Sequence, residues 1–189
     1  DFNDVLKKIN KIFIVACGTA YHAGLVGRLA IEKLAGIPVE TDIASEFRYR
    51  KVLWQPDDLM IVISQSGETA DTLAALREAK SHGIKVLAVT NVVGSAVARE
   101  ADRVIYTHAG PEIAVASTKA YSTQLVVMYL LAIYMANIRQ SYDQDKLKGL
   151  THEMCYLDTM VEQVLKENDA LKALAGKYRD VQDTFFLGR

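Results

Sequence analysis

The stretch "LMIVISQSGETADTLAALREAK" (residues 59–80) carries the signals that decide the fold. Its first five residues, 59–63, are all apolar, as expected for a parallel strand that helices cover on both faces. A helix is predicted from Thr69 to His82 by the spacing of the apolar residues, and Gly83 ends it. A buried strand, a short polar turn and a helix together form the repeating unit of a parallel α/β sheet.

The same unit recurs along the chain. Strand alternates with helix five times, which predicts an α/β fold: a three-layer sandwich with a five-stranded parallel sheet, helices on both faces and right-handed crossovers. The predicted strands cover residues 11–16, 38–44, 59–63, 85–90 and 102–107, and the predicted helices cover 21–36, 69–82, 95–101 and 119–137.

The domain organisation is predicted from a shift in composition after the last long helix. The sheet domain is expected over residues 1–140, a helical connector over 141–180 with amphipathic helices at 151–165 and 168–178, and one further strand over 181–189. Because the chain starts at Asp1 and stops after the apolar run "TFFLGR", we expect it to be a piece of a longer protein.

Composition narrows the classes of function. The 189 residues include 22 basic and 23 acidic side chains, so the net charge of −1 provides no basic surplus for nucleic acid or an anionic membrane. The two cysteines, Cys17 and Cys155, form no disulfide framework and suit a reducing compartment. The most apolar long stretch, residues 125–138, is shorter than the ~20 residues of a membrane span and is predicted to be a buried helix. We therefore expect a cytoplasmic protein with no nucleic-acid or membrane partner.

Polar turns with small residues follow four of the predicted strands. They are "CGTA" (17–20), "SQSGET" (64–69), "TNVVGS" (90–95) and "HAGPEIAVAST" (108–118). Ligands of open parallel sheets bind beyond the carboxyl ends of the strands, so the four turns together predict one site.

The "SQSGET" turn predicts a phosphate site. Ser64, Ser66 and Thr69 bring three hydroxyls to a helix N-terminus, where free N–H groups favour an anion, and Gly67 keeps the turn compact. The alternative is that Ser66 or Thr69 only caps the helix. The sequence contains neither a Walker A loop nor a dinucleotide fingerprint, so a monophosphate fits better than a nucleoside triphosphate.

The remaining candidates have two readings each. Cys17 is either a nucleophile or a structural residue beside a glycine turn, and the structural reading is favoured because the turn contains no histidine. The histidines are scattered singly without metal-ligand spacing, so no metal is expected. Glu112, Ser117 and Lys119 either line the pocket or belong to an ordinary helix start with Ser117 as the N-cap.

With "CGTA", "SQSGETADTL", "TNVVGS" and "EIAVASTKA" in this order, the chain resembles the first sugar isomerase (SIS) domain of the glucosamine-6-phosphate synthases, also called glutamine–fructose-6-phosphate aminotransferases. "SQSGET" is typical of SIS domains in general, whereas "EIAVASTKA" (112–120) narrows the match to the synthases. The resemblance covers nearly all of the chain, including "ASEFRYR" (44–50). It implies that residues 1–140 are the SIS domain and that 181–189 are the first strand of a truncated second SIS domain.

The resemblance also implies a function. The synthases convert fructose 6-phosphate and glutamine to glucosamine 6-phosphate and glutamate without a metal or an organic cofactor, and ammonia reaches the sugar site from an N-terminal glutaminase domain. By this match the sugar phosphate is bound by Ser64, Gln65, Ser66 and Thr69, the sugar is lined by Cys17, Gly18 and Thr19, and its hydroxyls are contacted by Val115 and Ser117.

No catalytic residue is expected in this chain. In the synthases the catalytic glutamate, the ring-opening histidine and the Schiff-base lysine lie in the second SIS domain and the C-terminal tail, so the chain should bind the sugar phosphate without converting it. Two positions depart from the family. Ala20 replaces a serine that helps to hold the phosphate, and Ala114 replaces a glycine, which would strain the loop if that position needs a positive φ.

Two other functions are weighed against this one. An effector-binding SIS module of a sugar-phosphate-responsive regulator would be favoured by an adjacent basic helix-turn-helix segment, and the sequence has none. A stand-alone phosphosugar isomerase would need its own general base, for which Glu112 is the plausible carboxylate. A homodimer is expected, because the helix at 119–137 is apolar on nearly every face and one domain of this size is not expected to cover it. The resemblance implies the same, since SIS domains of this family pair.

Overall fold

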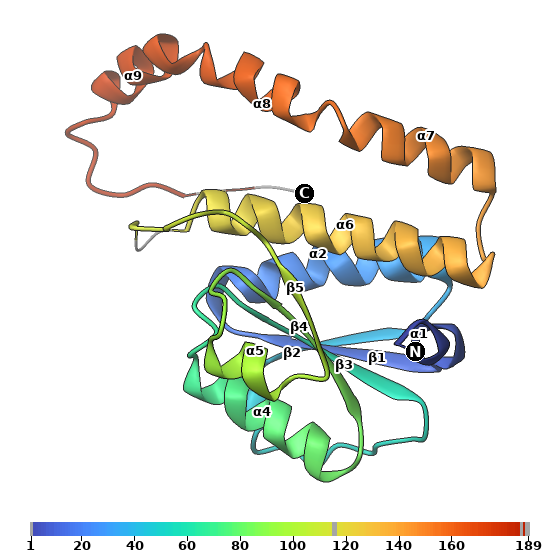
Figure 1. Cartoon of the computed structure of the whole chain (residues 1–189). Coiled ribbons are helices and arrows are strands. Elements are labelled where there is room, and N and C mark those ends of the chain that lie inside the picture. The colour runs from blue at the N-terminus through green and yellow to red at the C-terminus, as the bar shows by residue number, and fades with distance from the viewer. Residues whose placement is uncertain (1, 115–116, 186, 188–189) are drawn as a thin grey trace. The chain divides into compact units, whose positions relative to one another are not determined.

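The chain folds around a five-stranded parallel sheet in the computed structural model, which describes residues 2–114, 117–185 and 187 (Figure 1). The strand order is β2-β1-β3-β4-β5, and each neighbouring pair is parallel. This confirms the predicted α/β class and the five-stranded parallel sheet. The strands are β1 (Lys11–Ala16), β2 (Val39–Ile43), β3 (Asp58–Ser64), β4 (Lys85–Thr90) and β5 (Arg103–Tyr106).

Helices cover both faces of the sheet, as predicted for a three-layer sandwich. α2 and α6 pack against each other over one face, and α4 and α5 lie over the other (Figure 1). α3 contacts α4 and lies on the same side. α1, which the sequence reasoning missed, contacts α6. The bounds are α1 (Phe2–Lys8), α2 (Gly18–Ala35), α3 (Ala44–Phe47), α4 (Ala70–Ser81), α5 (Ala96–Glu100) and α6 (Lys119–Arg139).

The core has two halves, because alternate residues of a strand face opposite sides of the sheet. On the side of α4, Phe13 and Met60 pack in a buried cluster with Phe47. On the side of α2, Ile14 lies so close to the helix that a Cβ on Gly24 would be 2.9 Å from its Cγ2 atom. β3 is buried along its whole length, which explains why its sequence shows no polar alternation.

α6 is longer than the apolar run that predicted it. It has 21 residues and, within the described part of the chain, is the one helix long and apolar enough to cross a membrane by length and composition. The argument that this segment is too short for a span is therefore wrong. Packing of α6 against α2 accounts for the composition of its buried face, while Tyr129 (44%), Leu130 (45%) and Tyr134 (42%) remain exposed on the other face.

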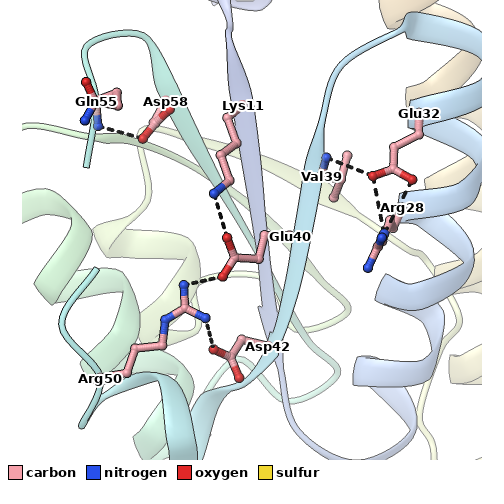
Figure 2. A network of polar contacts seen from close by, with 9 residues as sticks. All are labelled: Lys11, Arg28, Glu32, Val39, Glu40, Asp42, Arg50, Gln55 and Asp58. Atoms are coloured by element: carbon pink, nitrogen blue, oxygen red, sulfur yellow. Dashed lines mark hydrogen bonds and ion pairs between the residues drawn. The ribbon is translucent and has the colours of Figure 1, made fainter. Parts of the chain in front are cut away.

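An ion-pair network lies along the edge strand β2 (Figure 2). Glu40 accepts a hydrogen bond of 2.6 Å from Lys11 and pairs with Arg50, which also donates to Asp42 at 2.8 Å. Burial acts to raise the pKa of Glu40, but the hydrogen bonds from Lys11 and Arg50 outweigh it and hold the pKa below its ordinary value. The network therefore favours the charged form of this carboxylate.

The chain divides into two compact units, residues 1–147 and 148–189. The helix predicted over 151–165 is wrong, because the N–H groups of Cys155 and Tyr156 bond to carbonyls three residues back and end a helix there. No strand is found in the described residues of 181–189. The predicted boundaries at 140 and 180 stay predictions. The helices are α7 (Gln144–Met154), α8 (Leu157–Leu165) and α9 (Asn168–Lys177).

Candidate functional site

The turns that were predicted to form a site do meet at the carboxyl edge of the sheet. Ala16 at the end of β1 pairs with Ile63, and Ser64 at the end of β3 pairs with Thr90, so the turns that follow lie side by side. A cavity of 220 Å³ lies among them. Its lining consists of Cys17, Thr19, Ala20, Ile63, Ser64, Gln65, Ser66, Thr69, Ser117 and Gln124.

The cavity brings together most of the residues that the sequence singled out for binding. Gly18 is not in the lining and instead begins α2 with a φ of +58°. Val115 lies outside the described residues. Gln124 is in the lining although the sequence reasoning missed it, because a single glutamine ahead of an apolar run gave no signal beyond its polarity. The members that were predicted are Cys17, Thr19, Ser64, Gln65, Ser66, Thr69 and Ser117.

The hydroxyls of the phosphate turn, residues 64–69, are fixed by bonds within the turn. Ser64 Oγ accepts from the N–H of Gly67 at 3.0 Å and lies 3.0 Å from Thr69 Oγ1. Ser66 Oγ accepts from the N–H of Glu68 at 3.2 Å. The side chains are thus held in place before any ligand arrives, which lowers the entropy cost of binding.

Gly67 lets the phosphate turn press against α5. Its φ is +65°, and a Cβ there would lie 2.1 Å from Ser95 Oγ. The Gly67 carbonyl accepts from the N–H of Val97 at 2.9 Å, and the Glu68 carboxylate accepts from the N–H of Ala96 at 2.8 Å. These bonds join the turn to the start of α5. Neither Glu68 nor Ser95 was singled out within the predicted turns, because their contact forms between segments far apart in the chain.

The helices α2 and α4 both begin beside the cavity without a side-chain cap. Cys17 and Thr69 are the N-cap residues, and neither makes a capping hydrogen bond. The Thr69 hydroxyl pairs with Ser64 instead, so the simple capping reading of this turn is wrong. First-turn N–H groups without a capping partner and the positive ends of two helix dipoles make this edge favourable for an anion.

Glu112 caps α6 and is not available as a general base. Its Oε2 accepts from the N–H groups of Thr118 and Ala120, both at 3.1 Å. The hydrogen bond from the Ala120 N–H lowers the pKa of Glu112 most, and the bond from the Thr118 N–H lowers it further. Thr118 is the N-cap residue, so the reading of Ser117 as N-cap is wrong, and Ser117 lines the cavity instead.

The loop between β5 and α6 is tied to the turn after β4. Asn91 Oδ1 accepts from the Ala109 N–H at 2.9 Å, and Asn91 Nδ2 donates to the Gly110 carbonyl at 2.7 Å. The non-glycine residues with positive φ in the described chain include His108 but not Ala114, so the strain considered for Ala114 does not arise. A hollow of 550 Å³ lies beside this loop, between Gln65 and Glu112.

A larger hollow of 660 Å³ lies at the opposite, amino-terminal edge of the strands. Its walls include Trp54, Asp58 and His82. It lacks the convergent hydroxyls and the helix N-termini of the smaller cavity, so we place the candidate site at the carboxyl edge despite the difference in size. No group of three or more histidine, cysteine, aspartate or glutamate side chains able to hold a metal is found in the part of the chain that the structure describes.

Comparisons with known proteins point to one family. Residues 5–134 match the family model described as SIS domain. The glutamine–fructose-6-phosphate aminotransferase of Clostridium tetani is 62% identical over 97% of this chain, and that of Clostridium perfringens is 55% identical over 98%. The chain spans 30% of the length of these relatives. The C-terminal domain of the Francisella tularensis enzyme superposes with a TM-score of 0.95 and 38% identity, over all of this chain and 53% of that one.

Proposed function

The chain belongs to the SIS domain family, and from this premise we propose that it is the sugar-phosphate-binding part of a glutamine–fructose-6-phosphate aminotransferase. In this proposal the full-length enzyme converts fructose 6-phosphate and glutamine to glucosamine 6-phosphate and glutamate. This chain contributes the cavity that holds fructose 6-phosphate, and glucosamine 6-phosphate after the reaction.

The arrangement of the phosphate turn is the observation that carries the proposal. Ser64, Ser66 and Thr69 present hydroxyls at the uncapped N-terminus of α4, inside a cavity of 220 Å³. Among the described residues the lining contains no basic side chain, so the phosphate would be held by hydroxyl and backbone N–H donors. Hydrogen bonds to a charged group contribute about 1.5–3 kcal/mol each, so a few of them support binding without a cation.

The sugar would lie against the other walls of the cavity. Cys17 and Thr19 at the start of α2 and Ser117 before α6 are placed to contact it, and Gly18 and Val115 belong to the same proposed set. Ala20 offers a methyl group where the family has a serine, which removes one hydroxyl from the site.

Binding is not expected to be followed by conversion. The described lining contains no carboxylate, imidazole or amine, and Glu112 is engaged in capping α6. General acid–base groups contribute about 10²–10⁴-fold each, and a carbonyl-activating lysine cannot be replaced by hydroxyls. The chain alone should therefore bind fructose 6-phosphate and leave it unchanged, with neither metal nor organic cofactor.

Calorimetry with fructose 6-phosphate and with unphosphorylated fructose tests the binding. We expect heat of binding for the phosphate ester only. Incubation with fructose 6-phosphate and an ammonium salt, followed by assays for amino sugar and glucose 6-phosphate, should detect no product. Absence of binding would contradict the proposed site. Turnover within about a hundredfold of a full-length aminotransferase would show that catalytic groups lie in this chain.

The exposed face of α6 supports a homodimer, and the two free cysteines, Cys17 and Cys155, support a reducing compartment such as the cytoplasm. Tyr129, Leu130 and Tyr134 are each more than two-fifths exposed on one apolar helix, which is a surface that association would cover. The net charge of −1 supports neither a nucleic-acid nor an anionic membrane partner. Light scattering at tens of micromolar should give the mass of a dimer, and Leu130→Glu should reduce it to that of a monomer.

A further inference from the structure

Gln124 presents a buried polar group for which the residues described by the structure provide no partner. It lies on α6 and is 2% exposed, and its Oε1 atom is fully buried without a hydrogen bond. Its neighbours one turn away on the buried face of the helix, Ala120 and Met128, are apolar. Buried acceptors are almost always paired, and leaving one unpaired destabilises the fold. An explanation is therefore needed for a glutamine at this position.

The place of the amide in the site suggests the explanation. Gln124 lines the 220 Å³ cavity together with Ser117, on the side formed by α6 and the segment before it. The hydroxyls for the phosphate come from the turn after β3. The amide therefore belongs to a different element from the phosphate turn, on a wall that otherwise offers the Ser117 hydroxyl.

The chemistry of the amide selects its partner. A carboxamide has an acceptor oxygen and a donor nitrogen, and which of the two faces a ligand is an assignment. A phosphate dianion accepts hydrogen bonds only and could pair with the nitrogen alone. A sugar hydroxyl both donates and accepts, so it satisfies the amide in either orientation. We propose that Gln124 is a substrate-binding residue that hydrogen-bonds a hydroxyl of the sugar and not the phosphate, an inference that rests on the proposed function.

The test compares two ligands in the complete 189-residue chain. Gln124→Met keeps the length of the side chain and removes both hydrogen-bonding atoms. By calorimetry we expect this substitution to weaken the binding of fructose 6-phosphate about fivefold to tenfold. The affinity for inorganic phosphate should stay within about twofold of the wild-type value. The melting temperature should not fall, because an unpaired polar group is replaced by an apolar one. Gln163→Met, on the exposed surface of α8, is the matched control and should change neither affinity.

Other outcomes are equally decisive. Wild-type affinity for fructose 6-phosphate in Gln124→Met would mean that the amide meets only water, and the inference would be wrong. An equal loss for both ligands would mean that Gln124 supports the phosphate turn, which also overturns it. If the wild type binds inorganic phosphate but not fructose 6-phosphate, the proposed function fails and this inference fails with it.

A measurement on the wild type tests the contact even if the Gln124→Met variant does not fold. With ¹⁵N-labelled glutamine, the side-chain NH₂ signal that is absent from the Gln124→Asn spectrum is assigned to Gln124. This signal should shift when fructose 6-phosphate is added and should stay in place with inorganic phosphate. A signal that responds to neither ligand would refute the contact.

Discussion

Replacing Gly67 by alanine tests whether the phosphate turn owes its position to its contact with α5. The φ of +65° is a left-handed conformation that costs an L-residue about 1–2 kcal/mol. The new Cβ would also lie 2.1 Å from Ser95 Oγ and 2.5 Å from Ser95 Cβ, so the turn or the helix must move. Overpacking of this kind costs about 1–3 kcal/mol. Gly67→Ala should therefore lower the free energy of unfolding by about 2–5 kcal/mol.

A second glycine separates the two contributions. Gly83 has a φ of +75°, and no atom lies within 4 Å of the Cβ that alanine would add. Gly83→Ala should therefore lower the free energy of unfolding only by the cost of the left-handed conformation, about 1–2 kcal/mol. Adding Ser95→Gly to Gly67→Ala removes both atoms that lie closest to the new methyl group. The double variant should regain most of the free energy of unfolding by which Gly67→Ala falls below Gly83→Ala.

Urea unfolding followed by circular dichroism gives the free energies, and calorimetry gives the affinity for fructose 6-phosphate. We expect Gly67→Ala to weaken binding about tenfold or more, because displaced hydroxyls no longer converge on the phosphate. Gly83→Ala should bind within about twofold of the wild type. An equal loss of stability in the two variants would refute the steric reasoning, and an unchanged affinity in Gly67→Ala would refute its link to the site.

Two further predictions concern side chains of the cavity, one concerns the capping of α6 and one concerns pH. Thr69→Ala should weaken the binding of fructose 6-phosphate about tenfold with little change in melting temperature, because one hydroxyl group that bonds the phosphate is lost. Equal affinities of the wild type and the variant by calorimetry would contradict this. Ala20→Ser should strengthen binding by restoring a hydroxyl to the lining, and weaker binding would mean that the cavity has no room for it. Glu112→Ala should lower the free energy of unfolding, measured in urea, because the N–H groups of Thr118 and Ala120 at the start of α6 lose their acceptor. The folded-state pKa of Glu40 is lowered, so its ion pairs stabilise the fold above the ordinary pKa of 4.5, and this stabilisation is lost as the pH falls through the folded-state value. Stability measured on either side of that window should fall more in the wild type than in Glu40→Gln, and parallel curves would contradict the assignment.

The parts of the fold that depend on local pattern could be predicted. An all-apolar run such as β3, with hydroxyls and a glycine after it, specifies both a buried strand and the position of the turn that follows it. The end of α2 was also predictable, since Gly36 adopts the left-handed conformation of a helix cap. Short elements without caps or long periodicity were not, which is why α1 was missed and the break at Cys155 was not foreseen.

The residues of the site could be predicted from the sequence, but the hydrogen bonds that hold its turns in place could not. The turns and their hydroxyls were found because they follow strands, and parallel strands end at one edge. The bonds from Glu68 to α5 and from Glu112 to α6 depend on tertiary packing that no spacing encodes. The burial of Gln124 depends equally on how α6 meets the cavity, so only coordinates could distinguish it from the other polar residues of the chain.

The ion pairs on β2 also bear on aggregation. β2 is an outer strand of the sheet, and the free edge of such a strand is a template on which another extended chain can grow. This edge carries the charged side chains of Glu40, Asp42 and Arg50. Pairing with another strand would therefore require the desolvation of carboxylates and a guanidinium, which costs free energy. Acid that neutralises Glu40 would remove part of this protection, because the ion pairs of this carboxylate are lost with its charge.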